Sequence, residues 1–290
     1  MLKVILIILL CSCLIILLEM IREQRTFCIN EYIIKSHKIK KEQKIVFLSD
    51  MHNHQYGINN EKLLKSIRDT APDLILIGGD MLVGKEHHDY QIALEFVKKL
   101  PEICPVYYAN GNHEQRMKEK PEEYDFSYSK YHDILKEAGV CFLENDNICV
   151  DSNGNNIRLS GLEIPRRCYT HFKKETLYME EVTERIGSSN NKKYEILLAH
   201  NPSYMKNYVE WGADLVLSGH LHGGIVRIPG LVGAISPSFE IFPKYSGDLY
   251  YEEDTAIVVS KGLGTHTINI RLFNPAEVVV IHLKSDNSCM

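Results

Sequence analysis

The sequence lacks the features that mark several large classes of protein. Its 290 residues carry a formal net charge of -5 and no extended basic field, so an extended nucleic acid is not an expected partner. The cysteines show no paired CxxC spacing, and the chain has no internal repeat and no low-complexity segment. With 44% hydrophobic and 24% charged residues, the composition suits one large α/β domain with an ample core.

Charge is also absent from residues 4–18, which together with Met20 and Ile21 approach the length of a membrane-spanning helix. We interpret residues 1–21 as a single N-terminal membrane anchor. A cleaved signal peptide is the competing interpretation, but only Lys3 precedes the apolar run and no small-x-small cleavage site follows it. A lipoprotein-type Cys13 is a third interpretation, although the apolar run continues past it.

Basic residues follow the apolar segment. Arg22 and Arg25 come soon after it and more lysines lie within 35–44, so the positive-inside rule favours a cytoplasmic domain. We assign 22–43 to a basic linker and a first edge strand. The lysines in it could also contact anionic headgroups, and the sequence leaves both interpretations open.

The cysteines beyond the anchor fit free thiols in a reducing compartment at least as well as disulfides. They are Cys28, Cys104, Cys141, Cys149, Cys168 and Cys289. We expect Cys104, Cys141 and Cys149 to be small buried hydrophobic residues.

Five apolar, β-branched runs each end in side chains that bind metals. Such runs are typical of buried strands, and ligands of open α/β sheets gather at the C-terminal ends of strands. A single Asp or His after a strand is more often a turn or capping residue, but five independent caps would not collect this ligand set. The pieces are Asp50-Met51-His52, Gly79-Asp80, Gly111-Asn112-His113-Glu114, His200 and Gly219-His220-Leu221-His222.

This ligand set predicts a site for two divalent metal ions. Two such ions about 3.5 to 4 Å apart need a shared anionic bridge, with open positions for water and phosphate oxygens. Asp80 is the expected bridge, and Asn112 supplies a neutral carbonyl oxygen. The mixed oxygen and nitrogen ligands are compatible with Mn, Fe or Zn and do not decide between them.

In order, these motifs resemble the calcineurin-like metallophosphoesterases, whose pattern is D-x-H, G-D, G-N-H-[DE], a lone H and G-H-x-H. The segments 260–264 and 271–277 resemble the ending of a bacterial membrane-anchored subgroup. The resemblance covers roughly 44–284, which we take as the metallophosphoesterase domain, with 285–290 as a tail. One departure is Gly223-Gly224-Ile225, where many relatives have Gly-Gly-Gln; it affects loop packing or substrate contact, not metal ligation.

The resemblance implies both the fold and the roles of the site residues. The implied fold is an α/β, four-layer αββα sandwich of two mixed sheets flanked by helices, with the metals at one edge. One metal would be held by Asp50, His52, Asp80 and His222, and the other by Asp80, Asn112, His200 and His220. His113 would be the catalytic residue that binds no metal. Beside Glu114 it could be held as an imidazolium, and it could donate a proton to the leaving group or stabilise negative charge in the transition state.

The remaining sequence predicts helices between the strands and a β-rich C-terminal part. Helices are expected at 61–69, 89–100, 128–138 and 203–211, and later strands at 225–228, 256–260, 267–272 and 277–283. Residues 115–131 could form a rim or lid. Arg166 and Arg167 could clamp a second phosphate or be plain surface charges. Surface positions are the default for His54, His87, His88, His171 and His266.

The leading hypothesis is a membrane-anchored phosphoesterase in which a metal-activated hydroxide cleaves a phosphodiester, phosphomonoester or pyrophosphate. The anchor makes a lipid-linked substrate attractive, and soluble nucleotides or phosphoproteins stay open. The alternative is a non-catalytic metal-binding scaffold for a protein partner. The intact ligand set and His113 speak against it, because a scaffold has no chemical need for His113.

Overall fold

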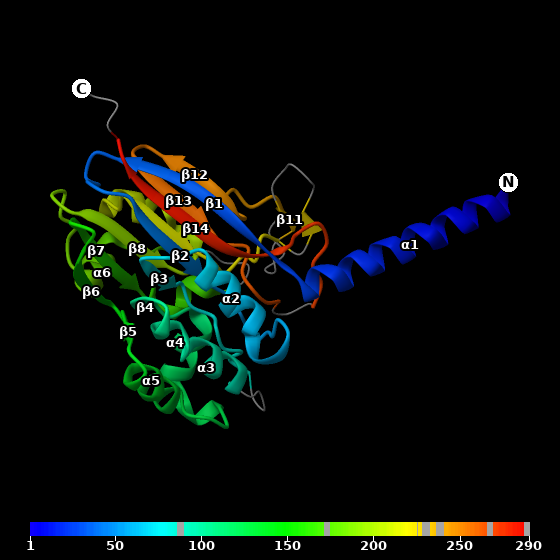
Figure 1. Ribbon diagram of the computed structural model, residues 1–290, viewed down its shortest axis with the longest axis horizontal. Coiled ribbons are helices and arrows are strands. Elements are labelled where there is room, and N and C mark those ends of the chain that lie inside the picture. Colours follow the sequence, from blue (N-terminus) through cyan, green and yellow to red (C-terminus); the bar gives the residue numbers. More distant parts are fainter. Residues whose placement is uncertain are drawn as a thin grey trace.

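The computed structural model describes residues 1–85, 90–170, 175–224, 226–227, 233–235, 241–265 and 269–286. Two six-stranded mixed sheets lie face to face and are covered on their outer faces by helices (Figure 1). The four-layer αββα architecture expected from the resemblance is therefore confirmed.

The first sheet has the strand order β1-β14-β2-β3-β4-β5. The four consecutive strands β2 to β5 run parallel to one another, whereas β14 is antiparallel to β2 and parallel to β1. The strands are β1 (Phe27–Ser36), β2 (Gln43–Leu48), β3 (Leu74–Ile77), β4 (Val106–Tyr108), β5 (Val140–Phe142) and β14 (Ala276–Ser285).

The second sheet has the order β12-β13-β9-β8-β7-β6, with parallel pairing from β13 to β7 and an antiparallel strand at each edge. A separate two-stranded sheet pairs β10 with β11. The strands are β6 (Asp146–Ser152), β7 (Asn155–Leu162), β8 (Tyr194–Ala199), β9 (Leu215–Ser218), β10 (Val226–Arg227), β11 (Gly233–Ile235), β12 (Asp248–Glu252) and β13 (Thr255–Val259).

Helices cover the outer face of each sheet. Near the first sheet lie α2 (Glu61–Asp69), α3 (Gln91–Val97), α4 (Asn112–Glu119) and α5 (Tyr128–Glu137); the second sheet packs against α6 (Met179–Ile186) and α7 (Met205–Trp211). Short 3-10 helices lie at Ile58–Asn60, Leu100–Glu102, Pro121–Glu123, Arg166–Tyr169 and Pro202–Tyr204.

Three apolar layers hold the sandwich together. Side chains such as Phe47, Leu76 and Leu198 fill the space between the sheets and are inaccessible to solvent. The second layer lies under α2 to α5, and the third lies under α6 and α7 around Tyr208 and Trp211. Because strands such as β3 are buried on both faces, their sequences are continuous apolar runs, as parallel strands require.

The N-terminal helix α1 (Leu2–Arg25) projects from the body of the molecule (Figure 1). It is long and apolar enough to cross a membrane, and the apolar part is not buried in the fold. Only one residue, Thr26, separates α1 from β1.

The structure corrects one predicted strand. The part of 267–272 that the structure describes is not a strand, apart from a single bridge between Leu272 and Val226. Its Arg271 is buried and donates to the backbone oxygens of Lys261 and Gly264. Arg271 thus bonds to the backbone of the 261–264 loop, and the segment does not extend as a strand.

A second correction concerns the cysteines. The described cysteines are all free thiols, but Cys149 is exposed and not a buried hydrophobic residue, because it lies on the outer edge strand β6. Cys104 and Cys141 are partly buried and pack against the apolar layers.

Candidate metal centre

The polar residues at the strand ends converge on one edge of the sandwich. Strands β2, β3 and β4 are paired in register, so the loops that follow them carry Asp50, Asp80 and Asn112 to the same edge. Strands β8 and β9 of the second sheet are paired in the same way and are followed by His200 and His220. Two sheets that do not share a strand thus supply one site.

The backbone at this edge is held in an uncommon conformation. The φ angles of Asp50, His52, Asp80, His220 and His222 are 52°, 46°, 53°, 70° and 52°, all in the left-handed region that residues other than glycine rarely adopt. Hydrogen bonds between the loops keep them there, for example from Asp50 N to Gly79 O (2.9 Å) and from His52 N to Asp80 O (3.0 Å). Such strain persists where the surrounding structure fixes it, commonly at functional sites.

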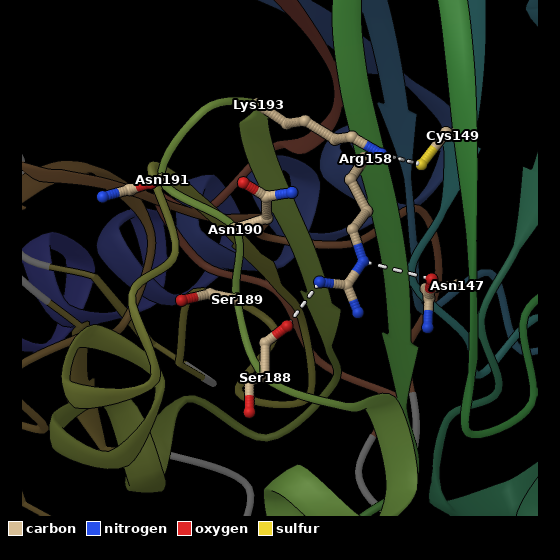
Figure 2. A pocket seen from close by; sticks show the side chains of 8 residues that line it. All are labelled: Asn147, Cys149, Arg158, Ser188, Ser189, Asn190, Asn191 and Lys193. Atoms are coloured by element: carbon tan, nitrogen blue, oxygen red, sulfur yellow. Dashed lines mark hydrogen bonds between the residues drawn. The ribbon is translucent and has the colours of Figure 1, made fainter.

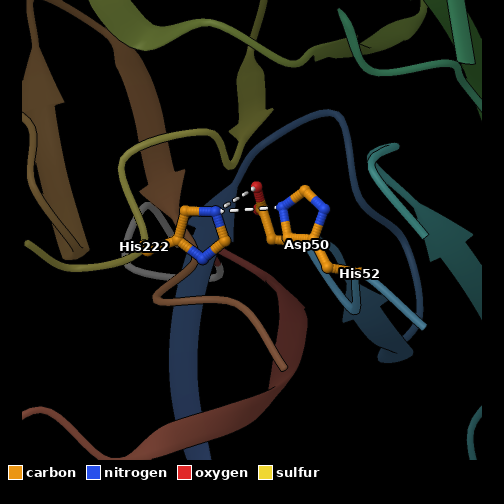
Figure 3. Close-up of side chains that lie close together, drawn as sticks. All are labelled: Asp50, His52 and His222. Atoms are coloured by element: carbon orange, nitrogen blue, oxygen red, sulfur yellow. Dashed lines mark hydrogen bonds and ion pairs between the residues drawn. The ribbon is translucent and has the colours of Figure 1, made fainter. Parts of the chain in front are cut away.

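Three overlapping groups of side chains at this edge could each hold a metal ion. One consists of Asp50, His52 and His222 (Figure 3), with His222 Nε2 3.4 Å from Asp50 Oδ1 and 3.1 Å from His52 Nε2. The other two share Asp80: it groups with His52 and His113, and with His200 and His220. In each group the ligand atoms lie within 4.8 Å of one another.

Backbone carbonyls orient three of the imidazoles. Nδ1 of His52 lies 3.1 Å from Leu82 O, Nδ1 of His200 lies 2.7 Å from Gly78 O, and Nδ1 of His222 lies 3.1 Å from Gly264 O. A proton held on Nδ1 by a carbonyl leaves Nε2 as the free ligand atom. Each Nε2 accordingly faces a carboxylate of the site, Asp50 or Asp80.

Asn112 provides a direct test of whether a metal fits. Its Oδ1 is buried and has no hydrogen-bond partner among the described residues. A buried carbonyl oxygen without a partner is costly, and coordination of a cation would satisfy it. The residues present therefore fit a metal at this position.

Close approach of the loops leaves no space for side chains at two glycines. A Cβ on Gly111 would lie 2.6 Å from the backbone nitrogen of Asp80, and one on Gly219 would lie 2.7 Å from Ser49 Oγ and 3.1 Å from Asp50 Cγ. Both glycines therefore let a second loop reach the aspartates.

His113 is oriented differently from the other histidines. The backbone N–H of Gly84 donates to its Nδ1 at 2.7 Å, so the ring proton is on Nε2. Nε2 lies 3.9 Å from Asp80 Oδ2 and faces the site. This contact favours a neutral ring that donates through Nε2, in place of the imidazolium expected from the sequence.

Burial and mutual charge shift the pKa values of the metal-free site. Burial is the largest influence on Asp50 and raises the pKa of that carboxyl to about 6. Burial would lower the pKa of His200, but the carboxylates of Asp80 and Asp50 outweigh it and raise this pKa to about 10. Although burial opposes ionisation of Asp80, the charge and hydrogen bond of the His200 imidazolium lower its pKa. The carboxylate between the histidines is thus the one kept ionised.

Sequence reasoning missed the role of Glu114. This residue is inaccessible to solvent and accepts hydrogen bonds from the backbone N–H groups of Asp80 (2.8 Å), Leu82 (3.1 Å) and Gly111 (3.1 Å). It therefore holds the two metal-site loops together and does not contact the His113 ring in the way the sequence suggested. The available signal was its place directly after His113.

Asn274 was also missed. It is fully buried, and its Nδ2 donates to the backbone oxygens of His222 (2.7 Å) and Gly224 (2.6 Å). It fixes the loop of the last motif from a segment fifty residues further along the chain. The string Phe273-Asn274-Pro275 was part of the tail resemblance, which is the signal that could have found it.

Other candidates from the sequence lie away from the site or are paired with protein groups. Arg167 pairs with Glu181 at 2.5 Å and Arg166 lies 3.6 Å from Glu119, as surface charges would. His54 is partly buried and contacts the end of α1, so a surface position was wrong for it. Residues 115–131 form mainly α4 and α5. The predictions for His87, His88, His171 and His266 lie outside the described residues.

A separate groove of about 690 Å³ lies by β6, β7 and the segment before β8 (Figure 2). Its central side chain, Arg158, is already bonded to the backbone oxygens of Ile186 and Ser188 and to Asn147. None of the metal-site residues lines this groove, so the chemistry is not located there.

Comparison with known proteins agrees with the geometry. The sequence profile "Calcineurin-like phosphoesterase" matches residues 43–224. An uncharacterized metallophosphoesterase, YkoQ of Bacillus subtilis, is 25% identical over 240 residues, covering 82% of this chain and 83% of that protein. An uncharacterized metallophosphoesterase of Aquifex aeolicus is 28% identical over 267 residues, covering 88% and 91%.

Solved structures with a similar arrangement include the phosphopantetheinyl hydrolase PptH from Mycobacterium tuberculosis, at 12% identity and a TM-score of 0.45, covering 78% of this chain and 92% of that one. The profile match spans most of the sandwich and ends just after His222. The chain belongs to the calcineurin-like phosphoesterase family and is a metallophosphoesterase.

Proposed function

We propose that this protein is a membrane-anchored phosphoesterase with two divalent metal ions in the centre described above. Asp50, His52, Asp80 and His222 would hold one ion, and Asp80, Asn112, His200 and His220 the other. The ions are manganese, iron or zinc. The substrate is a phosphate ester: a diester, a monoester or a pyrophosphate.

The position of Asp80 carries this proposal. Its Oδ2 lies 3.0 Å from Nε2 of His200, in the loop after β8 of the second sheet. The same oxygen lies 3.9 Å from Nε2 of His52, in the loop after β2 of the first sheet. A carboxylate between imidazoles from both sheets has the place of a ligand shared by two ions. Asp50 also lies near His200, with its Oδ1 3.7 Å from His200 Nε2.

When bound, two divalent ions supply positive charge for the phosphoryl oxygens and lower the pKa of the attacking water. The chain's own part is to hold the ester and to protonate the leaving group. His113 Nε2–H is the donor, because Gly84 occupies its other nitrogen. Ser49 Oγ and the backbone N–H of His220 donate to Asp50 and keep its carboxylate in place.

Helix α1 is the proposed anchor, with the domain on the cytoplasmic side because basic residues follow the apolar segment. A cleaved signal peptide would not need a last turn that is part of the folded domain. In α1 that turn includes Glu23, which is 1% exposed and accepts a hydrogen bond from Asn274 N.

The test is hydrolysis of bis(p-nitrophenyl) phosphate and of p-nitrophenyl phosphate by the full chain in detergent micelles, after metal removal with a chelator. We expect resupplied manganese to restore cleavage in the wild type and not in Asp80→Asn, which lacks the shared charge. Two bound metals without any cleavage of either ester would contradict ester hydrolysis and favour a narrow pyrophosphate specificity or the metal-binding scaffold.

A further inference from the structure

The C-terminal end of α1 is hydrogen-bonded to the folded domain. Glu23 Oε2 accepts a hydrogen bond from the backbone of Asn274 at 3.1 Å. Gln24 donates to the backbone oxygen of Asn269, and its own carbonyl accepts from His54 Nε2 at 2.9 Å. The last turn of the helix is thus fixed to two separate segments of the domain.

Each segment is linked to a loop that carries a metal-site residue. His54 lies two residues after His52 in the first loop. Asn274 binds the carbonyl of His222 through its side chain. The end of α1 is therefore linked to His52 through His54, two positions along the chain, and to His222 through Asn274. The Nε2 atoms of His52 and His222 lie 3.1 Å apart.

The connection between the apolar segment of α1 and the domain is short and helical. The uncharged part of α1 ends at Leu18, and the first charges after it, Glu19 and Arg22, pair with each other within the helix. At about 1.5 Å of rise per residue, Gln24 lies about 4.5 Å beyond Ile21 along the axis. The polar layer on each side of a bilayer is about 5 to 7 Å thick. The contacts of Glu23 and Gln24 consequently fall within that layer.

Two apolar side chains are exposed near the point where α1 meets the domain. Phe273, directly before Asn274, is 46% exposed, and Ile21 on the facing end of α1 is 39% exposed. Neighbouring apolar side chains that stay exposed can mark a site of contact with a membrane. The surface around the end of α1, which includes Ile21 and Phe273, is suited to contact with lipid.

We propose that the metal centre works within the headgroup layer and takes the phosphate ester of a membrane lipid as its substrate. This rests on the proposed function and adds the substrate class. The chemistry acted on, a phosphate ester, is shared with soluble substrates. What selects the lipid is the fixed height of the His52 and His222 loops above the apolar core of the bilayer.

The test changes that height without touching the metal centre. Seven residues of a polar helical sequence, inserted between Ile21 and Arg22, lengthen α1 by about 10.5 Å and nearly preserve its rotation. The contacts of Glu23 and Gln24 stay with the domain. The matched control carries the same seven residues between Met1 and Leu2, beyond the far end of the apolar segment, where they leave the height unchanged.

Each protein is reconstituted with manganese in phosphatidylcholine vesicles containing the p-nitrophenyl ester of phosphatidic acid. Its soluble counterpart, bis(p-nitrophenyl) phosphate, has the same leaving group. We expect the lengthened helix to reduce cleavage of the lipid ester at least tenfold and to leave cleavage of the soluble ester within twofold. The control insertion should change neither rate.

The outcomes separate this inference from the proposed function. If the wild type cleaves the soluble ester but not the lipid ester, or if lengthening α1 leaves lipid cleavage unchanged, the lipid assignment is wrong and the phosphoesterase stands. If the wild type cleaves neither ester, the proposed hydrolysis of phosphate esters fails with it.

A second measurement does not depend on activity or on a metal. A photoreactive benzoylphenylalanine at Phe273 should cross-link to lipid in vesicles, and the lengthened helix should abolish the cross-link. The matched position is Ile148, which is 37% exposed on the outer edge strand β6, on the side of the body away from α1 (Figure 1). Absence of a lipid adduct at 273, or equal adducts at both positions, would overturn the inference even if the insertion disturbed folding.

Discussion

Replacement of Gly111 by alanine should disable the metal centre while leaving the fold largely intact. The φ and ψ of Gly111 are -88° and -173°, an extended conformation that alanine adopts without strain. The added methyl group would lie 2.6 Å from Asp80 N and 2.7 Å from Asp80 Cγ. Ordinary carbon contacts are about 3.5 to 4 Å, so the Asp80 loop must move by about 1 Å.

The expected magnitudes follow from that displacement. Overpacking of this kind costs about 1 to 3 kcal/mol of stability. A displacement of about 1 Å at a reacting centre costs about 100-fold in rate. We therefore expect a small loss of thermal stability together with a loss of turnover of about 100-fold and weaker metal binding.

The assay compares metal content, turnover of bis(p-nitrophenyl) phosphate and the melting temperature of Gly111→Ala with those of Gly154→Ala. Gly154 lies between β6 and β7 with φ of 78° and no atom within 4 Å of an added Cβ. Its substitution should cost about 1 kcal/mol through the backbone alone and leave metal content unchanged. Full metal content and turnover within threefold of wild type in Gly111→Ala would refute the reasoning.

Three further predictions concern individual groups of the site. His113→Ala should keep its metals and lose at least about 100-fold on alkyl esters but much less on aryl esters, as a lost proton donor requires; equal losses on both would exclude that role. Glu114→Gln should weaken metal binding by about 10-fold to 100-fold, measured by chelator competition, because an amide cannot accept all the N–H groups the carboxylate holds. Because the carboxylates of Asp80 and Asp50 raise the pKa of His200 to about 10, metal must displace a proton below that pH, and apparent affinity should rise up to about tenfold per pH unit. An affinity that does not change between pH 7 and pH 9 would contradict this.

The sequence predicted that these polar side chains would gather at one edge of the sheets, because the signal for this is local. Runs such as Leu74–Ile77 are apolar on both faces, and the polar residue that ends each run must lie at the edge of a parallel sheet. The order and spacing of the five motifs then indicated the resemblance to the calcineurin-like metallophosphoesterases. The structure brings Asp50, Asp80, His200 and their neighbours together as that reasoning required.

The unpredicted elements carry a weaker local signal. Strands β5, β6 and β12 lie at the ends of the two sheets, and β6 has the polar sequence Asp146–Ser152 with mostly exposed or half-buried residues. Edge strands have one unpaired side and need no continuous apolar run, so periodicity does not reveal them. Their pairing depends on the sheet already formed.

Contacts between segments that are far apart in the chain also could not be predicted from the sequence. Glu23 and Asn274 are separated by 251 positions, and neither has a neighbour in sequence that would indicate the pairing. The same holds for His54, which appeared to be a surface residue until α1 was placed beside it. Residues 22–43, assigned to a basic linker and a first edge strand, contain the edge strand β1, but the assignment missed that α1 continues to Arg25 and is separated from β1 by Thr26 alone.

The most direct test of the central claim is the anomalous scattering of manganese in crystals of the full chain. The account predicts two peaks, one on each side of the Asp80 carboxylate, and neither at full occupancy in Asp80→Asn. A single peak, or two peaks that do not share Asp80 as a ligand, would contradict a two-metal centre built around this residue.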